Sequence, residues 1–157
     1  MMKNLSFSAL LLAALIMLAS CSNKKQNAQP GLEVTANNIS GVWQLASWSG
    51  ADEMPDSGAY VYIEIERRDQ KFTLYQNIDS FSARRITGTY NIYTDEEAGA
   101  VIRGRYDYGT GDWQHRYIVR DLTPNSMTWV AKDAPEDVSV YVRCKSLPDF
   151  LLNDSGQ

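Results

Sequence analysis

From residue 39 onward, apolar and polar residues alternate with a period of two, which is the spacing of a β-strand rather than of an amphipathic helix. Short groups of turn-forming residues, rich in Asp, Gly, Asn and Pro, separate the alternating segments. These separators are too short to hold a crossover helix, so neighbouring strands have to pair antiparallel. We expect eight strands, over residues 41–48, 59–67, 71–78, 85–93, 100–108, 113–120, 126–131 and 138–144.

Eight antiparallel strands in up-and-down order can remove their exposed edges by closing into a barrel. The sequence therefore predicts an all-β fold, an eight-stranded antiparallel up-and-down β-barrel, with an open β-sandwich as the competing architecture. Gly88 and Gly104 lie in mid-strand, where glycine commonly allows the sharp bends of a small barrel. After the last strand, residues 149–152 either form one helical turn against the barrel or fray.

The N-terminus has the pattern of an export signal. Lys3 supplies a positive charge, and residues 5–18 are almost entirely apolar but too short for a comfortable membrane span, which needs about 20 residues. The stretch ends in Leu18-Ala19-Ser20-Cys21, which resembles the lipobox of bacterial lipoproteins. The resemblance implies that residues 1–20 are a lipoprotein signal peptide and that a lipid is attached to Cys21. An ordinary secretory signal and a retained signal anchor are the alternatives.

Residues 21–38 are polar and contain few large apolar side chains, so they cannot bury enough surface to offset the entropy of ordering. We interpret them as a lipidated flexible tether that precedes a barrel domain over residues 39–157. Lipidation of Cys21 leaves Cys144 as a single thiol, which excludes an intramolecular disulfide. We expect Cys144 to be a small buried residue near a strand end rather than a reactive thiol.

The net charge of the chain argues against two classes of binding partner, nucleic acids and anionic lipid surfaces. The chain has 15 basic and 19 acidic residues, and Lys3 alone of these lies in residues 1–20, so the mature chain carries 14 and 19, a net charge of −5. An acidic chain lacks the basic contacts that dominate nucleic-acid binding and broad adhesion to anionic lipid. We expect no nucleic-acid partner, and membrane attachment through the lipid on Cys21.

A second resemblance lies within the predicted barrel. Residues 39–45 contain a Gly-x-Trp motif, and residues 121–129 and 141–143 match a late hairpin and a closing strand. Together they resemble the corresponding segments of lipocalins and lipocalin-like bacterial lipoproteins. The resemblance implies that Trp43 packs across the barrel floor, with Arg143 as the candidate to lie over it.

Strand alternation assigns side chains to the two faces of the sheet. In the first strand, Trp43 is in phase with Leu45, whereas Gln44 and Trp48 are out of phase and are expected to matter less to the core. In the last strand, two assignments stay open. Arg143 points inward as the resemblance implies, or the inward set consists instead of Val138, Val140 and Val142.

Four inward residues are the candidate ligand-binding set: Tyr90, Tyr106, His115 and Tyr117. The chain has nine Tyr and four Trp, whose apolar rings and polar tips suit a small amphipathic ligand. A packed core uses the same residue types, and an eight-stranded barrel can be filled or hold one small ligand. Both interpretations stay open from the sequence.

The sequence contains no pattern typical of a catalytic or metal-binding site. His115 is the single histidine, which excludes a multi-histidine metal site, and no G-x-S-x-G segment accompanies it. The alternating acids Glu64 and Glu66 are typical of a solvated strand face, and the acidic turn 95–97 lacks the ligand spacing of a calcium loop. We expect no catalytic residue, metal or cofactor, and surface positions for Arg84, Arg85, Arg103, Arg105, Arg116 and Arg120.

The sequence therefore favours a non-enzymatic, lipocalin-like lipoprotein that binds a small apolar or amphipathic ligand in the cell envelope. The alternative is an envelope structural or protein-interaction module with a solid barrel core. Ser22 rather than Asp follows Cys21, which resembles outer-membrane lipoproteins, and residues 23–25 lack the acidic cluster of a surface-export signal. We expect the outer membrane and a periplasmic orientation.

Overall fold

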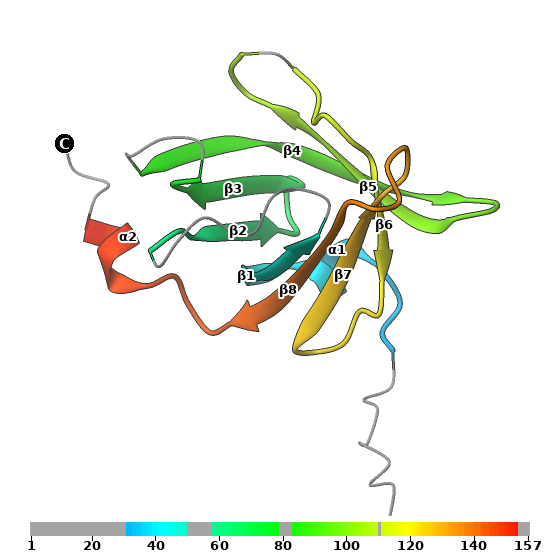
Figure 1. Ribbon diagram of the computed structural model, residues 1–157, viewed down its shortest axis with the longest axis horizontal. Coiled ribbons are helices and arrows are strands. Elements are labelled where there is room, and N and C mark those ends of the chain that lie inside the picture. The colour runs from blue at the N-terminus through cyan, green and yellow to red at the C-terminus, as the bar shows by residue number, and fades with distance from the viewer. Residues whose placement is uncertain (1–30, 50–57, 79–82, 110, 154–157) are drawn as a thin grey trace, which may run out of the picture.

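The computed structural model describes residues 31–49, 58–78, 83–109 and 111–153, so the predicted signal peptide and Cys21 lie outside the described residues. Within these ranges, eight antiparallel strands pair in sequence order, and β1 also pairs with β8 to close a barrel (Figure 1). The predicted eight-stranded up-and-down barrel is confirmed, and the open sandwich is excluded. The strands are β1 Gly41–Ser49, β2 Val61–Glu66, β3 Lys71–Gln76, β4 Arg84–Asp95, β5 Gly99–Tyr106, β6 Tyr117–Arg120, β7 Ser126–Ala131 and β8 Val138–Cys144.

The predicted strand over residues 113–120 is too long, because β6 begins only at Tyr117. Before it, the chain turns through Gly109 and Gly111, whose φ angles of 89° and 87° favour glycine. Residues 111–113 then run beside β5 without continuing the strand, and the Trp113 amide donates to the Gly104 carbonyl at 2.9 Å. This detour carries the Trp113 side chain into the barrel, where it packs against the core.

A short helix, α1 (Ala36–Ile39), and the residues before it close one end of the barrel. Thr35 caps the helix by accepting a hydrogen bond from the Asn38 amide at 3.2 Å. The Leu32 amide donates to the Leu122 carbonyl at 2.7 Å, and Ile39 is fully buried. The prediction of a flexible tether is therefore wrong for residues 31–38, since they pack on the barrel instead.

The mid-strand glycines make room for aromatic rings. Neither Gly88 nor Gly104 has a left-handed φ, so the bend expected from sequence is not what requires glycine there. A Cβ at Gly104 would overlap the indole of Trp113, and a Cβ at Gly88 would overlap the backbone carbonyl of Arg105 and lie 2.6 Å from the Phe72 ring. The two glycines thus let large rings lie directly on the strand backbone.

The inward and outward alternation of β1 changes partway along the strand. Leu45 pairs with Tyr141 and Ser47 pairs with Val140, so the register shifts between Leu45 and Ser47 as in a β-bulge. After the shift, Trp48 lies on the inward face and packs against the core. The prediction that Trp48 is out of phase with the core is wrong, because alternation cannot anticipate a bulge.

At the other end of the chain, α2 (Asp149–Asn153) packs on the outside of the barrel. Leu151 and Leu147 are buried against Tyr62, and the ring of Phe150 lies 5.2 Å from that of Tyr60. Of the two possibilities left open for residues 149–152, the structure shows the helical turn against the barrel. Over the described ranges, the structure contains no helix of the length and apolar character that crossing a membrane requires.

Candidate functional site

One end of the barrel is packed around Trp43, which is fully buried. The Trp43 indole N–H donates to the Ile39 carbonyl at 2.8 Å, and the Arg143 guanidinium lies 4.0 Å from the ring centroid. Arg143 also donates to the carbonyls of Ser40 and Asn38, at 2.5 and 2.7 Å. The structure thus places Arg143 over Trp43, as the resemblance implies, in a cation–π contact.

The position of Arg143 decides between the two assignments for β8. Tyr141 and Ser139 share its face and are buried, whereas Val142 is 38% exposed. The valines of β8 therefore form the outward set. Burial lowers the pKa of Arg143. The carbonyls of Ser40 and Asn38 accept hydrogen bonds from its guanidinium and so stabilise the charged form.

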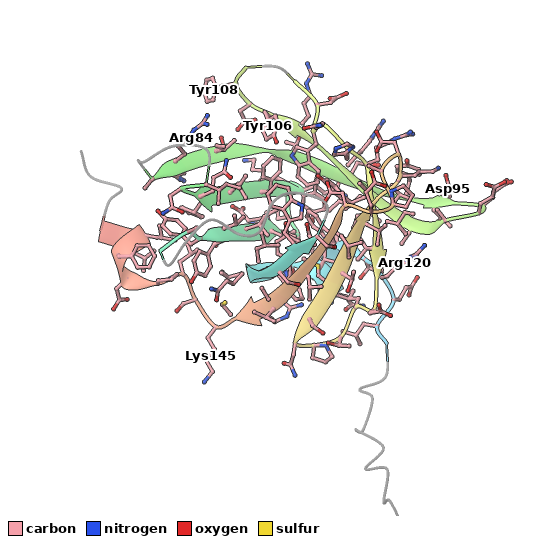
Figure 2. All side chains as sticks on the ribbon, in the orientation of Figure 1. Arg84, Asp95, Tyr106, Tyr108, Arg120 and Lys145 are labelled. Atoms are coloured by element: carbon pink, nitrogen blue, oxygen red, sulfur yellow. The ribbon has the colours of Figure 1, made fainter. Side chains whose placement is uncertain are left out.

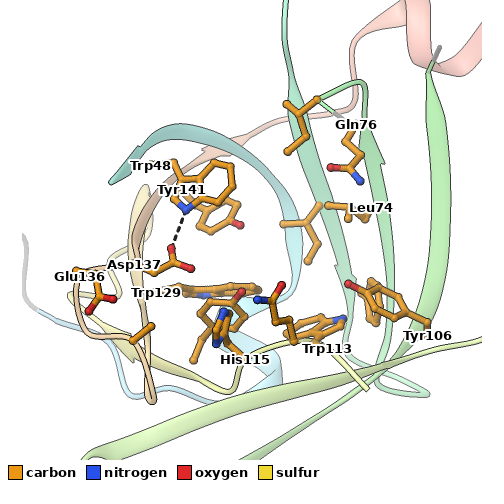
Figure 3. Close-up of a pocket in the computed structure, with 16 residues that line it drawn as sticks. Trp48, Leu74, Gln76, Tyr106, Trp113, His115, Trp129, Glu136, Asp137 and Tyr141 are labelled. Carbon is orange, nitrogen blue, oxygen red and sulfur yellow. Dashed lines mark hydrogen bonds between the residues drawn. The ribbon is translucent and has the colours of Figure 1, made fainter. Parts of the chain in front are cut away.

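The other half of the barrel interior is hollow. A pocket of about 470 Å³, here called the barrel pocket, opens between β1, β3, the connection before β6, and β7–β8. Figure 3 shows Trp48, Trp129 and Tyr141 on one side, facing Leu74 and Gln76 across the space. Packed core and pocket therefore coexist, in different halves of one barrel.

Stacked aromatic rings form much of the pocket wall. The Trp129 ring lies 4.9 Å from that of Tyr141, 5.4 Å from Tyr117 and 5.7 Å from Trp113. Phe72 extends the series, at 5.0 Å from Trp113. Tilted and edge-to-face contacts at these distances are favourable, so the rings stabilise one another within the wall.

Polar groups are placed at a few points on this wall. The Trp48 indole N–H donates to Asp137 Oδ1 at 2.7 Å (Figure 3). Burial, with a further contribution from the charge of Asp137, raises the pKa of Tyr117 to about 12. Burial also raises the pKa of Tyr141. Both hydroxyls therefore stay protonated at neutral pH and can donate hydrogen bonds into the pocket.

One buried donor on the wall lacks a partner. Trp129 is 4% exposed, and its Nε1 has no hydrogen-bond partner among the described residues. Leaving a buried donor unpaired costs about 1–3 kcal/mol, so such groups are usually paired with protein, water or ligand. Trp129 lines the barrel pocket, so this unpaired donor belongs to one of the rings of the pocket wall.

Comparison with known proteins connects this geometry to a family. The family model of the lipocalin-like domain matches residues 39–129, which span the strands from β1 to β7. The chain belongs to the lipocalin-like domain family. Among solved structures, it is similar to a lipocalin-like protein from Bacteroides uniformis ATCC 8492, with 16% identity and a TM-score of 0.49 over 68% of this chain and 99% of that chain. No curated protein matches the sequence.

The lipocalin-like barrel brings three of the four predicted ligand-binding residues to the pocket, namely Tyr106, His115 and Tyr117. Tyr90 is placed elsewhere, and its assignment to the ligand site needs correction. It faces inward as expected, but it is buried in the packed half, where its hydroxyl donates to the Glu66 carbonyl at 3.1 Å. Alternation identified its face but not its depth along the barrel.

Several residues that line the barrel pocket were not among the four ligand-binding residues predicted from the sequence. Trp129 shares a strand face with the buried Met127, so alternation could have found it. Trp48 was assigned to the wrong phase because of the β-bulge. Asp137 lies in the turn before β8, where sequence patterns assign no direction to a side chain. The acidic group of the site was therefore beyond the reach of the alternation argument.

His115 lies at the pocket rim, with its Nδ1 2.9 Å from Asp133 Oδ1. This hydrogen bond lowers the pKa of Asp133 and fits a rim histidine with a structural partner. Cys144 is half-buried beside the residues that α2 covers, and burial raises the pKa of its thiol. A protonated thiol in an apolar setting matches the expected packing role.

The acidic turn is occupied by protein donors. Asp95 accepts hydrogen bonds from the amides of Glu97 and Ala98, at 3.2 and 3.0 Å, and pairs with Lys132. Within the described part of the chain, no group of three or more histidine, cysteine or acidic residues could hold a metal ion. Glu64 and Glu66 lie on the outward face of β2, opposite to the buried Ile63 and Ile65.

The six arginines expected at the surface are all exposed. Two of them, Arg84 and Arg85, border a second, open depression of about 850 Å³, here called the arginine hollow. Arg84 projects from the start of β4 toward Tyr108, which is 86% exposed (Figure 2). Gln76 and Tyr106 line both the arginine hollow and the barrel pocket, so the two spaces adjoin.

Proposed function

We propose that the protein is a lipid-anchored, non-enzymatic binding protein of the cell envelope whose barrel pocket holds one small amphipathic ligand. The observation that carries the proposal is the hollow half of the barrel, with its volume of about 470 Å³ and its aromatic wall. Sites for small molecules commonly measure about 300–1,000 Å³ and combine apolar walls with few polar groups. The alternative with a solid core has less support, because the core fills only the half around Trp43.

The polar groups of the pocket indicate an amphipathic rather than a purely apolar ligand. The unpaired Trp129 indole N–H would donate a hydrogen bond to a ligand oxygen. The hydroxyls of Tyr117 and Tyr141 offer further donors beside the same rings. A hydrocarbon would leave these groups without partners in a desolvated site, which is costly.

The envelope location and the anchor rest on the sequence alone. The lipobox resemblance at residues 18–21 supports lipidation of Cys21, and Ser22 supports sorting to the outer membrane, with the barrel facing the periplasm. A binding protein held at a membrane keeps its ligand near that surface without a membrane-spanning segment of its own. The absence of a sequence pattern for catalysis supports a binding role rather than an enzymatic one.

A fluorescent probe tests the pocket directly. Residues 21–157, with Cys21→Ser to avoid lipid and detergent, contain every described residue of the barrel. We expect N-phenyl-1-naphthylamine, a neutral dye that brightens in apolar surroundings, to bind this chain with one site. Leu74→Trp places a large ring in the pocket and should weaken binding by at least about tenfold.

The matched control is Leu152→Trp, the same exchange at a position that is 55% exposed on α2. It should leave dye binding unchanged. Equal dye affinities for Leu74→Trp and the parent chain would show that the dye binds outside the pocket. That result, or the absence of dye binding, would contradict the proposed function.

A further inference from the structure

We infer that the barrel pocket selects an organic cation, held by the carboxylate of Asp137 and by the aromatic rings around it. The inference rests on the proposed function, since it names the chemical class of the ligand that the same pocket takes. It follows from three observations: the charges on the pocket wall, the placement of one carboxylate among aromatic rings, and the separate position of the basic side chains.

The wall of the barrel pocket is acidic. Among the described residues that line it, Asp137 and Glu136 are carboxylates, and neither lysine nor arginine is present. His115 is the one basic side chain in this described lining, and Asp133 faces it at 2.9 Å. A positive charge on His115 would therefore be compensated locally by Asp133. A cationic ligand gains from this field, whereas an anionic ligand would be repelled.

Asp137 is held in a fixed orientation by one of the rings. Its Oδ1 accepts the hydrogen bond from the Trp48 indole at 2.7 Å. No hydrogen bond within the described part of the chain engages its Oδ2, so this oxygen can accept from a ligand ammonium group. A carboxylate whose orientation is set before binding loses less entropy when a charged donor arrives. The resulting charge-assisted hydrogen bond is stronger than a neutral one.

Aromatic rings surround the same carboxylate. Trp48, Trp129 and Tyr141 line the pocket together with Asp137, and Figure 3 shows the carboxylate between Trp48 and Trp129. The faces of indole and phenol rings carry negative charge density and attract cations, most strongly for tryptophan. Rings and a carboxylate around one space are the chemical features that recognise alkylammonium groups. The apolar remainder of the ligand would contact the Leu74 side of the pocket.

The basic side chains near the pocket lie outside this aromatic space. Arg84 and Arg85 border the arginine hollow, which adjoins the pocket at Gln76 and Tyr106. An anionic ligand would have to place its charge there, away from Asp137 and the aromatic wall. Asp137 and the rings around it thus favour a cationic ligand, whereas the arginine hollow favours an anionic one. Ligands that differ only in charge can therefore distinguish the two sites.

Three competitors with one ring system separate these preferences. They are 2-(1-naphthyl)ethylamine, which is a cation, 2-(1-naphthyl)ethanol, which is neutral, and 3-(1-naphthyl)propionate, which is an anion. Each is titrated against N-phenyl-1-naphthylamine bound to residues 21–157 at mildly alkaline pH. We expect the amine to bind about tenfold tighter than the alcohol, given typical cation–π and charge-assisted contributions. The propionate should bind more weakly than the alcohol.

The variant Asp137→Asn removes the charge but keeps an oxygen that can accept from Trp48. In this variant, the amine should bind no tighter than the alcohol. The affinity of the alcohol for the variant should equal its affinity for the parent chain. The matched control is Asp69→Asn, which removes an exposed carboxylate in the β2–β3 turn. This turn lies near Gly41 at the start of β1, whereas Asp137 lies near Ser49 at the end of β1. It should retain the full preference for the amine.

The outcomes separate the inference from the proposed function. Equal affinities for amine and alcohol, or a preference for the amine that survives Asp137→Asn, would overturn the inference and leave the binding function standing. Tightest binding of the propionate would overturn it in favour of the arginine hollow. Failure of all three competitors and of the dye would contradict the proposed function, and the inference with it.

Discussion

At the scale of single residues, the floor of the barrel depends on the pair of Trp43 and Arg143. The Trp43 ring fills the space between α1 and the strands, and the guanidinium of Arg143 covers it. Arg143 also donates hydrogen bonds to the carbonyls of Asn38, Ser40 and Pro124. One cation thus joins β8, α1 and the turn before β7.

Replacing Trp43 tests this arrangement. Trp43→Ala should lower the free energy of unfolding by about 3–5 kcal/mol, because it leaves a cavity and removes the ring under Arg143. The control is Gln44→Ala, on the opposite face of β1, which should cost about 1 kcal/mol or less. Urea denaturation of residues 21–157 measures both changes. Equal effects of the two substitutions would contradict the structural role of Trp43.

The alternation of apolar and polar residues can assign a side chain to the inward or outward face only within a regular strand. Alternation placed Trp43, Tyr106 and Tyr117 on the inward face, because a side chain changes sides with each residue along a regular strand. It failed for Trp48, where one extra residue in the bulge reverses the phase. It also could not place Asp137, because a turn residue has no assigned face.

At the scale of elements, the β4–β5 hairpin projects beyond the rest of the barrel (Figure 1) and is fixed by a contact distant in sequence. Asp95 at its turn pairs with Lys132, which follows β7. The hydrogen bond from Lys132, then those from the amides of Ala98 and Glu97, lower the pKa of Asp95 to about 2. The hairpin and the β7–β8 connection at the pocket rim are therefore coupled.

This contact predicts a dependence of stability on pH. Because folding lowers the pKa of Asp95 from 3.8 to about 2, its contribution is present at neutral pH and is lost as the pH falls between these values. Asp95→Asn should therefore destabilise the protein at neutral pH but have little effect at pH about 2. Urea unfolding at both pH values, with Glu97→Gln as the control in the same turn, measures the difference. An equal loss at both pH values would contradict the assignment.

The number and order of the strands could be predicted because short turns between alternating segments permit few topologies. The start of β6 could not be predicted, since residues 113–116 alternate like a strand yet are not part of one. Packing of residues 31–38 was also missed. Their polar composition hides that Leu32 and Val34 contact the core, a contact that depends on the barrel already being closed.

At the scale of the whole molecule, the barrel has a packed half and a hollow half. Sequence could not decide between core and pocket, because the same tyrosines and tryptophans serve both. The distinction depends on where along the barrel axis each ring lies. Trp43 and Tyr90 fill the closed half, whereas Trp129 and Tyr141 form a wall beside the pocket.

The proposed anchor makes a prediction for the full chain in cells. If lipid on Cys21 is the membrane attachment, Cys21→Ser should move the protein from the membrane fraction to the soluble fraction or leave an uncleaved precursor. Cell fractionation with radiolabelled fatty acid measures both properties. Cys144→Ser is the control and should remain labelled and membrane-bound. Normal labelling and fractionation of Cys21→Ser would exclude the lipobox interpretation.

Native mass spectrometry tests the binding function most directly. Residues 21–157 with Cys21→Ser are incubated with a small-molecule extract of the cell envelope and separated from unbound material. We expect a mass excess corresponding to one small molecule, which is released on denaturation and is absent from Leu74→Trp. A spectrum showing the mass of the chain alone, or the same excess in Leu74→Trp, would contradict a ligand site inside the barrel.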